Sequence, residues 1–124
     1  MARPYGLPHI QLPKKAEGDE MNACFIVRAQ VADAALKDEF DRWYQEEHLP
    51  DAHKAFNALR AWRGWSEVDS SMHYAVYEFK DMATVRAIQG SDPLKRLVAE
   101  FDRVWGDRVK RSRDIVEVIQ AIGA

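Results

Sequence analysis

The sequence lacks several features that would assign a protein to a class at once. It has one cysteine, Cys24, so an internal disulfide is impossible, and a lone thiol is typical of a reducing compartment. It has no apolar run long enough to cross a bilayer, and its first residues lack the apolar stretch of a signal peptide. The formal net charge is only −2, so no overall field attracts nucleic acid or anionic lipid. We expect a cytoplasmic protein that binds neither nucleic acid nor membrane.

Three sequence motifs of nucleotide and hydrolase sites are also missing. The chain contains no Gly-x-Gly-x-x-Gly, no Gly-x-x-x-x-Gly-Lys and no Gly-x-Ser-x-Gly. This argues against a dinucleotide, a P-loop nucleotide and an α/β-hydrolase triad, and we expect no cofactor. What remains is ordinary for a soluble globular domain: 124 residues, 47% hydrophobic and 31% charged, enough to bury one core without a disulfide or a metal.

The first 21 residues differ from the rest of the chain. Pro4, Pro8 and Pro13 interrupt any regular element there, and a polar run occupies residues 14–20. The sequence therefore predicts an extended arm over residues 1–21 and a single folded domain over residues 22–124.

Hydrophobic periodicity within the domain predicts four strands and two helical regions. The strands are runs rich in β-branched and aromatic residues, whereas the helical regions have apolar residues at the i, i+4, i+7 spacing of one face. Proline disfavours helical backbone in the residue before it, so Pro50 is expected to end the first helix. The expected strands cover residues 22–31, 59–68, 72–79 and 114–122. The first helix is expected from Asp33 to Pro50. The second helical region is expected to begin at Asp81, break at Gly90, restart at the capping residue Asp92 and stop at Gly106. This βαββαβ order predicts an α+β, ferredoxin-like fold with a four-stranded antiparallel sheet and two helices on one face.

The strands also predict how the protein assembles. In the first strand Phe25 and Val27 point to one face of the sheet, while Cys24 and Ile26 point to the other. Helices can cover only one face, so the second apolar face needs another cover. Pairing with an identical sheet is the simplest solution, and we expect a homodimer. Inside this apolar strand Cys24 is expected to be an inert, buried thiol.

The end of the first helix carries the densest group of reactive side chains. Extending the apolar face by seven residues from Phe40 reaches Glu47, and extending it by four from Tyr44 reaches His48. A carboxylate and an imidazole that continue a buried face have perturbed pKa values, which suits a general acid or base. The alternative is that both side chains only cap the helix end and hydrogen-bond the following loop.

A metal site is not expected at this helix end. Pro50 separates His48 from His53, so the two imidazoles cannot lie one helical turn apart as in a His-Glu-x-x-His helix. A group of basic residues precedes the last predicted strand, and we interpret it as a solvated turn. Its members are Arg108, Lys110, Arg111 and Arg113.

The predicted hairpin supplies further candidate binding residues. Alternation places Arg63 and Trp65 on one face of their strand, and His73 and Tyr77 on one face of the next. If these faces lie under the helices, the side chains could share a pocket with the end of the first helix. The candidate set for substrate binding is Trp43, Tyr44, Arg63, Trp65, His73 and Tyr77.

The stretch from Phe40 to Asp51, FDRWYQEEHLPD, resembles the dimeric α/β-barrel superfamily and looks most similar to its EthD-like branch, whose first helix ends in a Trp-Tyr…Glu-His-Leu-Pro pattern. The resemblance implies a dimer whose two sheets form a barrel, with a pocket between each sheet and its own helices. Superfamily members include cofactor-free polyketide cyclases, quinol-forming monooxygenases, lactone isomerases and haem-degrading enzymes. The resemblance also implies that His48, with Glu47 beside it, is the first residue to test for a functional role. The sequence departs from the family at residues 54–57, Lys-Ala-Phe-Asn, where Pro-Gly-Phe is common.

Three functional hypotheses follow. The first is a small cofactor-independent enzyme, of cyclase, isomerase or monooxygenase type, that acts on a hydrophobic or aromatic molecule through acid–base chemistry at His48. In it, Arg63 or Tyr77 polarises a carbonyl or stabilises an enolate. The second is a non-catalytic homodimer that binds a small apolar ligand or serves as an accessory protein. The third is a helix end that is filled and purely structural.

Overall fold

The computed structural model describes residues 20–123, so the predicted arm of residues 1–21 lies outside the described residues except for its last two. The domain has the predicted βαββαβ order. Its elements are β2 (Ala23–Gln30), the short 3-10 turn η1 (Ala34–Leu36), α1 (Lys37–Trp43), the π-helical turn η2 (Tyr44–His48), α2 (Leu49–Phe56), β3 (Arg60–Trp65), β4 (Met72–Phe79), α3 (Met82–Ile88), α4 (Asp92–Trp105), the 3-10 turn η3 (Gly106–Arg108) and β5 (Lys110–Glu117).

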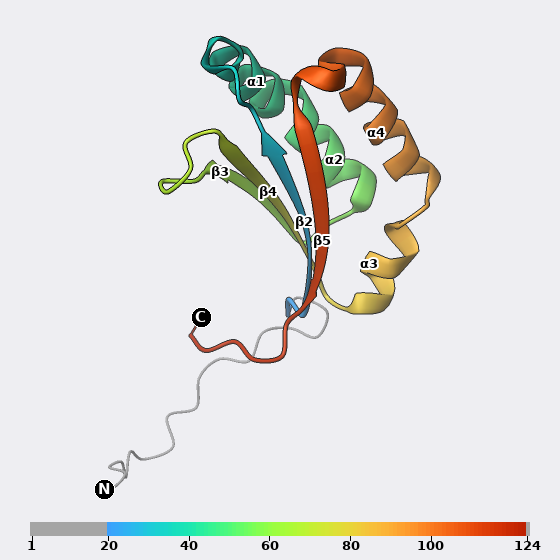
Figure 1. The fold of residues 1–124 in the computed structure, drawn as a ribbon. Helices are drawn as coiled ribbons and strands as arrows, with labels where there is room; N and C mark the ends of the chain where they lie inside the picture. The colour runs from blue at the N-terminus through green and yellow to red at the C-terminus, as the bar shows by residue number, and fades with distance from the viewer. Residues whose placement is uncertain (1–19, 124) are drawn as a thin grey trace, which may run out of the picture.

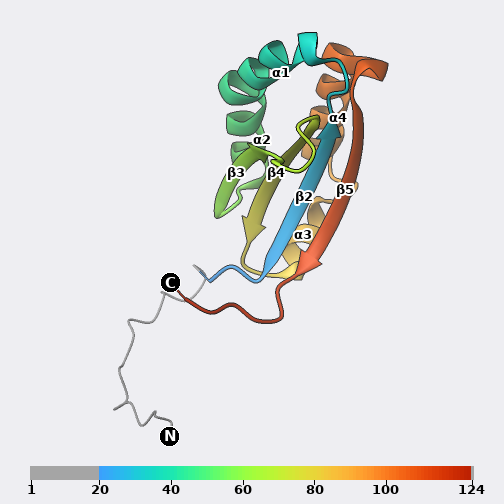
Figure 2. The same cartoon turned by 60° about the vertical axis from the view of Figure 1, so that its left-hand side comes forward.

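The four strands form one antiparallel sheet in the order β3-β4-β2-β5, and the helices cover one of its faces (Figures 1 and 2). The central strand β2 aligns Phe25 with Tyr77 of β4 and with Ile115 of β5. These three side chains therefore point to the same face, under the helices. The arrangement confirms the predicted ferredoxin-like fold.

The sequence predicts that the first helical region ends at Pro50, and this prediction is wrong. The region continues to Phe56 because η2 is wound as a π-helix, in which the N–H of Leu49 bonds to the carbonyl of Tyr44, five residues back. Pro50 then enters the first turn of α2, where a missing N–H is tolerated. The helix ends instead at Asn57, which takes up the left-handed conformation with φ of 52°.

The π-helical turn changes which side chains face the core. One extra residue in the turn moves the buried face forward by one position. Tyr44, His48, Ala52 and Phe56 are buried at a constant spacing of four residues through the turn, whereas Glu47, seven residues after Phe40, is exposed. The expectation that Glu47 continues the buried face is therefore wrong, and the expectation for His48 is confirmed.

The second helical region breaks at Gly90, as predicted. Asp81 caps α3 by accepting a hydrogen bond from the Thr84 N–H at 2.8 Å. Ser91, rather than the expected Asp92, caps α4, because its hydroxyl oxygen accepts a bond from the Leu94 N–H. Gly106 ends α4 with φ of 53°, a conformation that favours glycine.

The last strand begins earlier than predicted. Pairing with β2 aligns Lys110 with Gln30 and Glu117 with Ala23, so the length of β2 sets both ends of β5. The basic residues interpreted as a solvated turn are therefore largely strand residues, and Ile119 and Ile122 lie beyond the strand, 86% and 89% exposed. β3 is also shorter than the predicted strand over 59–68, since it ends at Trp65. The Ser66 hydroxyl accepts hydrogen bonds from the Val68 and Asp69 N–H groups and so starts the turn.

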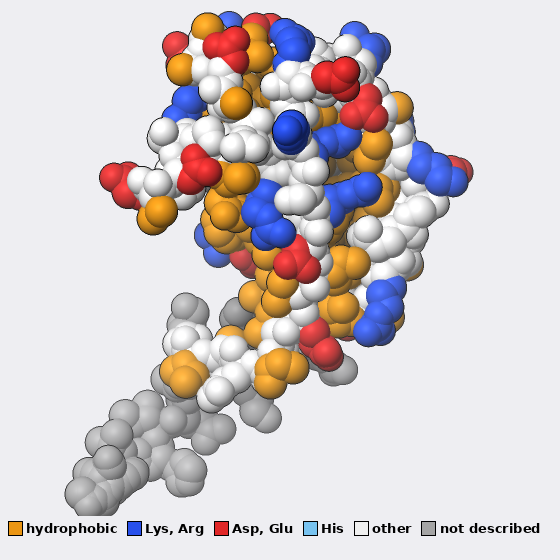
Figure 3. Space-filling view, in the orientation of Figure 1, with side chains coloured by type: hydrophobic (Ala, Val, Ile, Leu, Met, Phe, Trp, Pro, Cys, Tyr) orange, Lys and Arg blue, Asp and Glu red, His pale blue; other side chains and the backbone are white. Residues whose placement is uncertain are grey.

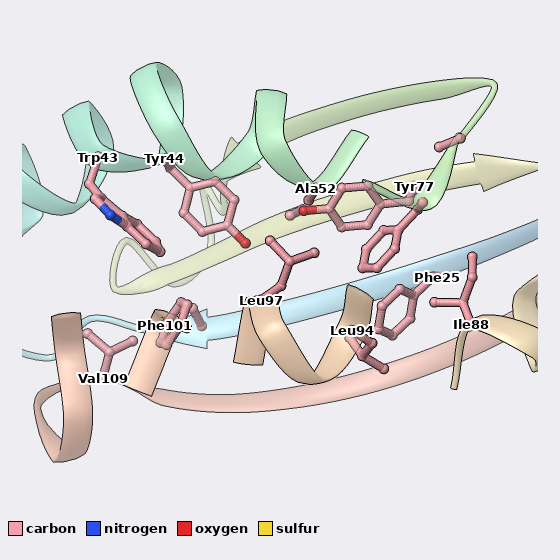
Figure 4. Close-up of a cluster of buried hydrophobic side chains, with 14 of the residues drawn as sticks. Phe25, Trp43, Tyr44, Ala52, Tyr77, Ile88, Leu94, Leu97, Phe101 and Val109 are labelled. Carbon is pink, nitrogen blue, oxygen red and sulfur yellow. The ribbon is translucent and has the colours of Figure 1, made fainter. Parts of the chain in front are cut away.

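The core between the sheet and the helices is unusually aromatic (Figure 4). Phe40 is fully buried on α1, and rings from η2, α4 and β4 surround it. The rings contact one another mostly edge to face or tilted, the arrangements that aromatic quadrupoles favour. No helix formed by residues 20–123 combines the length and the apolar character required to cross a bilayer.

The opposite face of the sheet has no helix over it (Figure 2). Cys24 and Ile26 of β2, Trp62 of β3, and Tyr74 and Val76 of β4 line an open depression of about 430 Å³ there. Trp62 is 42% exposed even though its indole N–H bonds to Glu78. The second apolar face is present as the alternation predicted, and the homodimer built on it stays a prediction.

Candidate functional site

His48 is the last residue of the π-helical turn, and its side chain is 8% exposed. The imidazole stacks on the indole of Trp43, with ring centroids 4.5 Å apart and planes 18° apart. Tyr44 and Phe101 contact it edge to face, at 4.9 and 5.9 Å between centroids. Aromatic rings on three sides therefore fix the orientation of His48.

His48 forms part of the walls of two spaces. On the outer side is a groove of about 450 Å³ between α2 and α4, lined by Trp43, Glu47, His48, Asp51, Arg96, Ala99, Glu100 and Arg103. On the inner side is a narrow cavity of about 30 Å³ between the helices and the sheet, which Tyr77 of β4 also lines. No group in the described part of the chain hydrogen-bonds the His48 ring, so the imidazole is not tied to the backbone as a helix cap would be.

Burial lowers the pKa of His48 from 6.5 to about 4. The nearby carboxylates of Asp51 and Glu100 act in the opposite direction, and the cations Arg111 and Arg96 add to the effect of burial. The imidazole is therefore neutral at pH 7, with one nitrogen able to accept a proton and the other able to donate a hydrogen bond.

Two ion pairs border the outer groove. Arg96 of α4 holds the Asp51 carboxylate of α2 with two bonds of 3.1 and 3.2 Å, and so joins the two walls in front of His48. Arg103 pairs with Glu100 on α4 itself. Glu47 lies exposed on the rim of this groove. It is close enough to the site to contact a ligand there, but it is not buried beside His48.

Arg63 and His73 lie on the helix-covered face of the sheet, as their alternation allowed, but they form a separate cluster. Arg63 donates bonds to the Asp41 carboxylate at 2.8 Å and to the Gln45 side chain at 3.2 Å. Trp65 donates its indole N–H to the same Asp41 oxygen at 3.0 Å. These bonds hold the edge strand β3 against α1 and lower the pKa of Asp41, chiefly through Arg63. Neither Arg63 nor Trp65 lines the groove or the cavity beside His48.

His73 is fully buried in this cluster. An Arg63 N–H lies 3.3 Å from its Nε2, and because a guanidinium can only donate, Nε2 is the acceptor and the proton of the neutral ring is on Nδ1. Nδ1 has no hydrogen-bond partner among residues 20–123. Burial first, and then Arg63, lower the pKa of His73 to about 4. The ring of Tyr44 contacts both imidazoles, 4.5 Å from His73 and 4.9 Å from His48, so it connects the two clusters.

Two tyrosines place hydroxyl groups inside this core. Figure 4 shows the side chains of Tyr44 and Tyr77 pointing toward one another between the helices and the sheet. Burial raises the pKa of Tyr44 to about 12 and raises that of Tyr77 well above 10. Both phenols stay protonated at pH 7, and Tyr77 lines the cavity beside His48. The hydrogen bond between the two hydroxyls also raises the pKa of Tyr77, so a ligand oxygen in the cavity would compete with Tyr44 for the Tyr77 proton.

Sequence reasoning missed Arg111 and Arg113, which also line the inner cavity. The sequence analysis places them in a turn because it predicts that the last strand begins at residue 114, whereas β5 begins at Lys110. The alternation of Val109, Arg111, Arg113 and Ile115 was the available signal, since it continues the helix-facing side of β5.

Cys24 is half-buried on the open sheet face rather than inside the core, and burial raises its pKa. Residues 20–123 contain no group of three potential metal ligands.

No family model matches the chain, and no curated protein matches it in sequence. Solved structures match it in fold. The cofactor-independent oxygenase SnoaB from Streptomyces nogalater has a TM-score of 0.62 at 10% identity, over 85% of this chain and 100% of that one. An ethyl tert-butyl ether D (EthD) family protein from Bacillus halodurans has a TM-score of 0.58 at 15% identity, over 76% and 97%. A dimeric ferredoxin-like protein from an uncultured marine organism has a TM-score of 0.59 at 12% identity, over 86% and 96%.

These likenesses confirm the expected resemblance to ferredoxin-like proteins of the dimeric α/β-barrel type, with an EthD family protein among them. At such low identities the likeness shows the fold alone.

Proposed function

We propose that this protein is a cofactor-independent enzyme that acts on a small hydrophobic or aromatic molecule, with His48 as the group that accepts or donates the proton. One observation carries the proposal. His48 is a neutral, aromatic-clamped imidazole with no hydrogen-bond partner in the described part of the chain, and it lies between an apolar cavity and an open groove. The ring nitrogens of His48 are not among the fully buried, unpaired polar atoms of residues 20–123, so the imidazole faces the open groove with hydrogen-bonding capacity that a ligand can use.

The surroundings of His48 support proton transfer at an apolar ligand. Trp43 and Ala99 provide apolar contacts in the groove, and Tyr77 offers a phenol for a carbonyl or enolate oxygen on the cavity side. A base with a pKa of about 4 is weak, so the proton it removes must be acidic, such as one next to a carbonyl or on a phenol. That the fold also occurs in a cofactor-independent oxygenase supports chemistry without a bound cofactor.

The test is a comparison of variants on a panel of small phenols, quinols, lactones and β-keto esters, followed by oxygen uptake and product analysis. We expect His48→Gln to abolish turnover of the substrate found, because glutamine can hydrogen-bond but cannot take up a proton. His53→Gln is the matched control, since His53 is exposed five residues further along the same helical region. Undiminished turnover by His48→Gln would overturn the assignment.

The alternative is a non-catalytic homodimer that binds a small ligand. The depression on the open sheet face, with Trp62 exposed in it, favours this hypothesis, because it is an apolar surface on the side of the sheet opposite the helices and His48, and the pairing of two such faces in a homodimer would enclose a ligand bound there. A ligand that binds tightly without turnover, and whose affinity falls in Trp62→Ala but not in His48→Gln, would support the alternative.

A further inference from the structure

The cavity beside His48 carries formal charge on only one wall. Apolar side chains from β2, α2 and α4 make up most of its lining. The charged lining residues are Arg111 and Arg113, which follow one another on the helix-facing side of β5. Because β5 is an edge strand of the sheet, this wall lies next to solvent, between β5 and α4. Figure 3 shows basic side chains beside apolar ones in that region.

The two arginines differ in their partners. Arg111 donates to the Asp102 carboxylate at 2.6 Å, and its guanidinium lies over the ring of Phe101 at 4.0 Å. Burial lowers its pKa, and its side chain is 22% exposed. These contacts give Arg111 a structural role. Arg113 is exposed to solvent at the mouth of the cavity and has no carboxylate within ion-pair distance among residues 20–123, so its guanidinium is available to bind an anion.

We propose that Arg113 binds the carboxylate of a small monocarboxylic acid whose slender apolar tail enters the cavity toward His48. This inference rests on the proposed function and names the substrate class for the same site. A guanidinium beside an apolar wall binds a carboxylate through charge-assisted hydrogen bonds that are stronger than those to a neutral group. Arg111 adds little to this attraction, because the Asp102 carboxylate at 2.6 Å compensates its charge.

The size of the cavity restricts the tail. A volume of about 30 Å³ holds little more than one water molecule, so a bound tail has to displace side chains such as Leu94 and Leu97 of α4. An unbranched chain requires the smallest displacement. The neutral imidazole of His48 and the phenol of Tyr77 are the polar groups that such a tail meets inside, which places a functional group on the tail within reach of the proposed base.

The experiment is calorimetric titration of the full-length protein with hexanoate, with its neutral match hexanamide and with acetate, which lacks the tail. We expect hexanoate to bind roughly tenfold more tightly than either. Arg113→Gln should remove that advantage, while Lys110→Gln, an exposed lysine on the other face of the same strand, should leave it in place. Equal binding of hexanoate and hexanamide, no binding of hexanoate, or an equal loss in Lys110→Gln would overturn the proposal.

The same titration separates this inference from the proposed function. His48→Gln should keep hexanoate affinity close to that of the wild type, because the carboxylate is bound at Arg113 and not at the imidazole. If turnover survives in His48→Gln while hexanoate binding is lost in Arg113→Gln, the proposed chemistry fails and the carboxylate site stands. If turnover is lost in His48→Gln but Arg113→Gln binds hexanoate normally, the carboxylate site fails and the chemistry stands. Circular dichroism melting of each variant shows whether the fold is retained.

Discussion

The imidazole of His48 lies flat against the indole of Trp43, with ring centroids 4.5 Å apart and an angle of 18° between the planes. Trp43 also lines the outer groove, so the indole shields one face of the imidazole from the water in it. This contact helps keep the side chain of His48 8% exposed and its pKa near 4. The protonation state of the proposed base therefore depends on a neighbouring residue that takes no part in proton transfer.

The first prediction concerns this contact. Trp43→Ala should raise the pKa of His48 toward 6.5, because solvent then reaches the imidazole, and should cost about 3–5 kcal/mol of stability. Trp43→Phe keeps an aromatic ring and should leave the pKa close to the wild-type value. NMR titration of the His48 ring protons measures both. A pKa that stays near 4 in Trp43→Ala would show that other groups control it.

The second prediction is a dependence of stability on pH. Folding lowers the pKa values of His48 and His73 from 6.5 to about 4. Between these values the unfolded state binds more protons than the folded state, so the free energy of unfolding rises with pH from about 4 to 6.5 and is fully present above 6.5. Each buried histidine contributes up to about 3 kcal/mol across that window. Urea denaturation at pH 4.5, 5.5, 6.5 and 7.5 measures the slope.

Matched variants assign that slope to the two buried rings. The double variant His48→Gln/His73→Gln should flatten the dependence above pH 4.5, whereas the exposed His53→Gln should not. The carboxylates whose pKa values are lowered, such as Asp41 and Asp51, titrate below their ordinary values and so act mainly below this window. An unchanged slope in the double variant would contradict the prediction.

Much of the fold follows from hydrophobic period. The alternation of apolar residues in β2 and β4 and the apolar face of α4 determine which side chains are buried, and the sequence predicts all three correctly. The end of the first helix is not predicted correctly, because local rules treat Pro50 as a stop. A π-helical turn carries the chain past the proline, and its long-range contacts are not visible in a single sequence: Tyr44 packs on His73 of the sheet, and His48 packs on Phe101 of α4.

The candidate site was predictable in part for the same reason. His48 was found because it extends an apolar face by four residues, and that spacing survives the π-helical turn from Tyr44 onward. Arg111 and Arg113 were missed because the ends of β5 are set by pairing with β2, which a single sequence does not show. Likewise, the grouping of Arg63 with Asp41 depends on contact between β3 and α1, which are distant in the chain.

The third prediction tests the ion pair between Arg63 and Asp41. The Arg63 side chain is 13% exposed and donates to Asp41, Gln45 and the backbone, so removal of either partner leaves groups unsatisfied. A double-mutant cycle of Arg63→Met and Asp41→Asn should give a coupling of about 1–3 kcal/mol. Arg63→Met should also raise the pKa of His73, because a nearby cation is lost. Additive effects on stability would show that the two residues act independently.

The fourth prediction concerns Pro50. If this proline disrupted a regular α-helix, its replacement by alanine would stabilise the protein by about 3 kcal/mol. The π-helical turn already provides the break in regular bonding that precedes Pro50, so Pro50→Ala should change stability by less than about 1 kcal/mol and leave the pKa of His48 near 4. Denaturation and NMR titration of this variant measure both. A gain of several kcal/mol with a shifted His48 pKa would mean that the proline itself forces the turn.

The last prediction concerns assembly. The open sheet face presents Ile26 and Trp62 without a cover among the described residues, and carries both Arg28 and Glu78, so the face can be complementary to itself around a two-fold axis. We expect a mass of twice 14.3 kDa by light scattering. Ile26→Glu should convert the protein to a folded monomer, because it buries a charge at the centre of the interface. Val68→Glu is the matched control, since Val68 is 98% exposed in the β3–β4 turn. A monomeric wild type, or an Ile26→Glu variant that stays dimeric, would exclude this face as the interface.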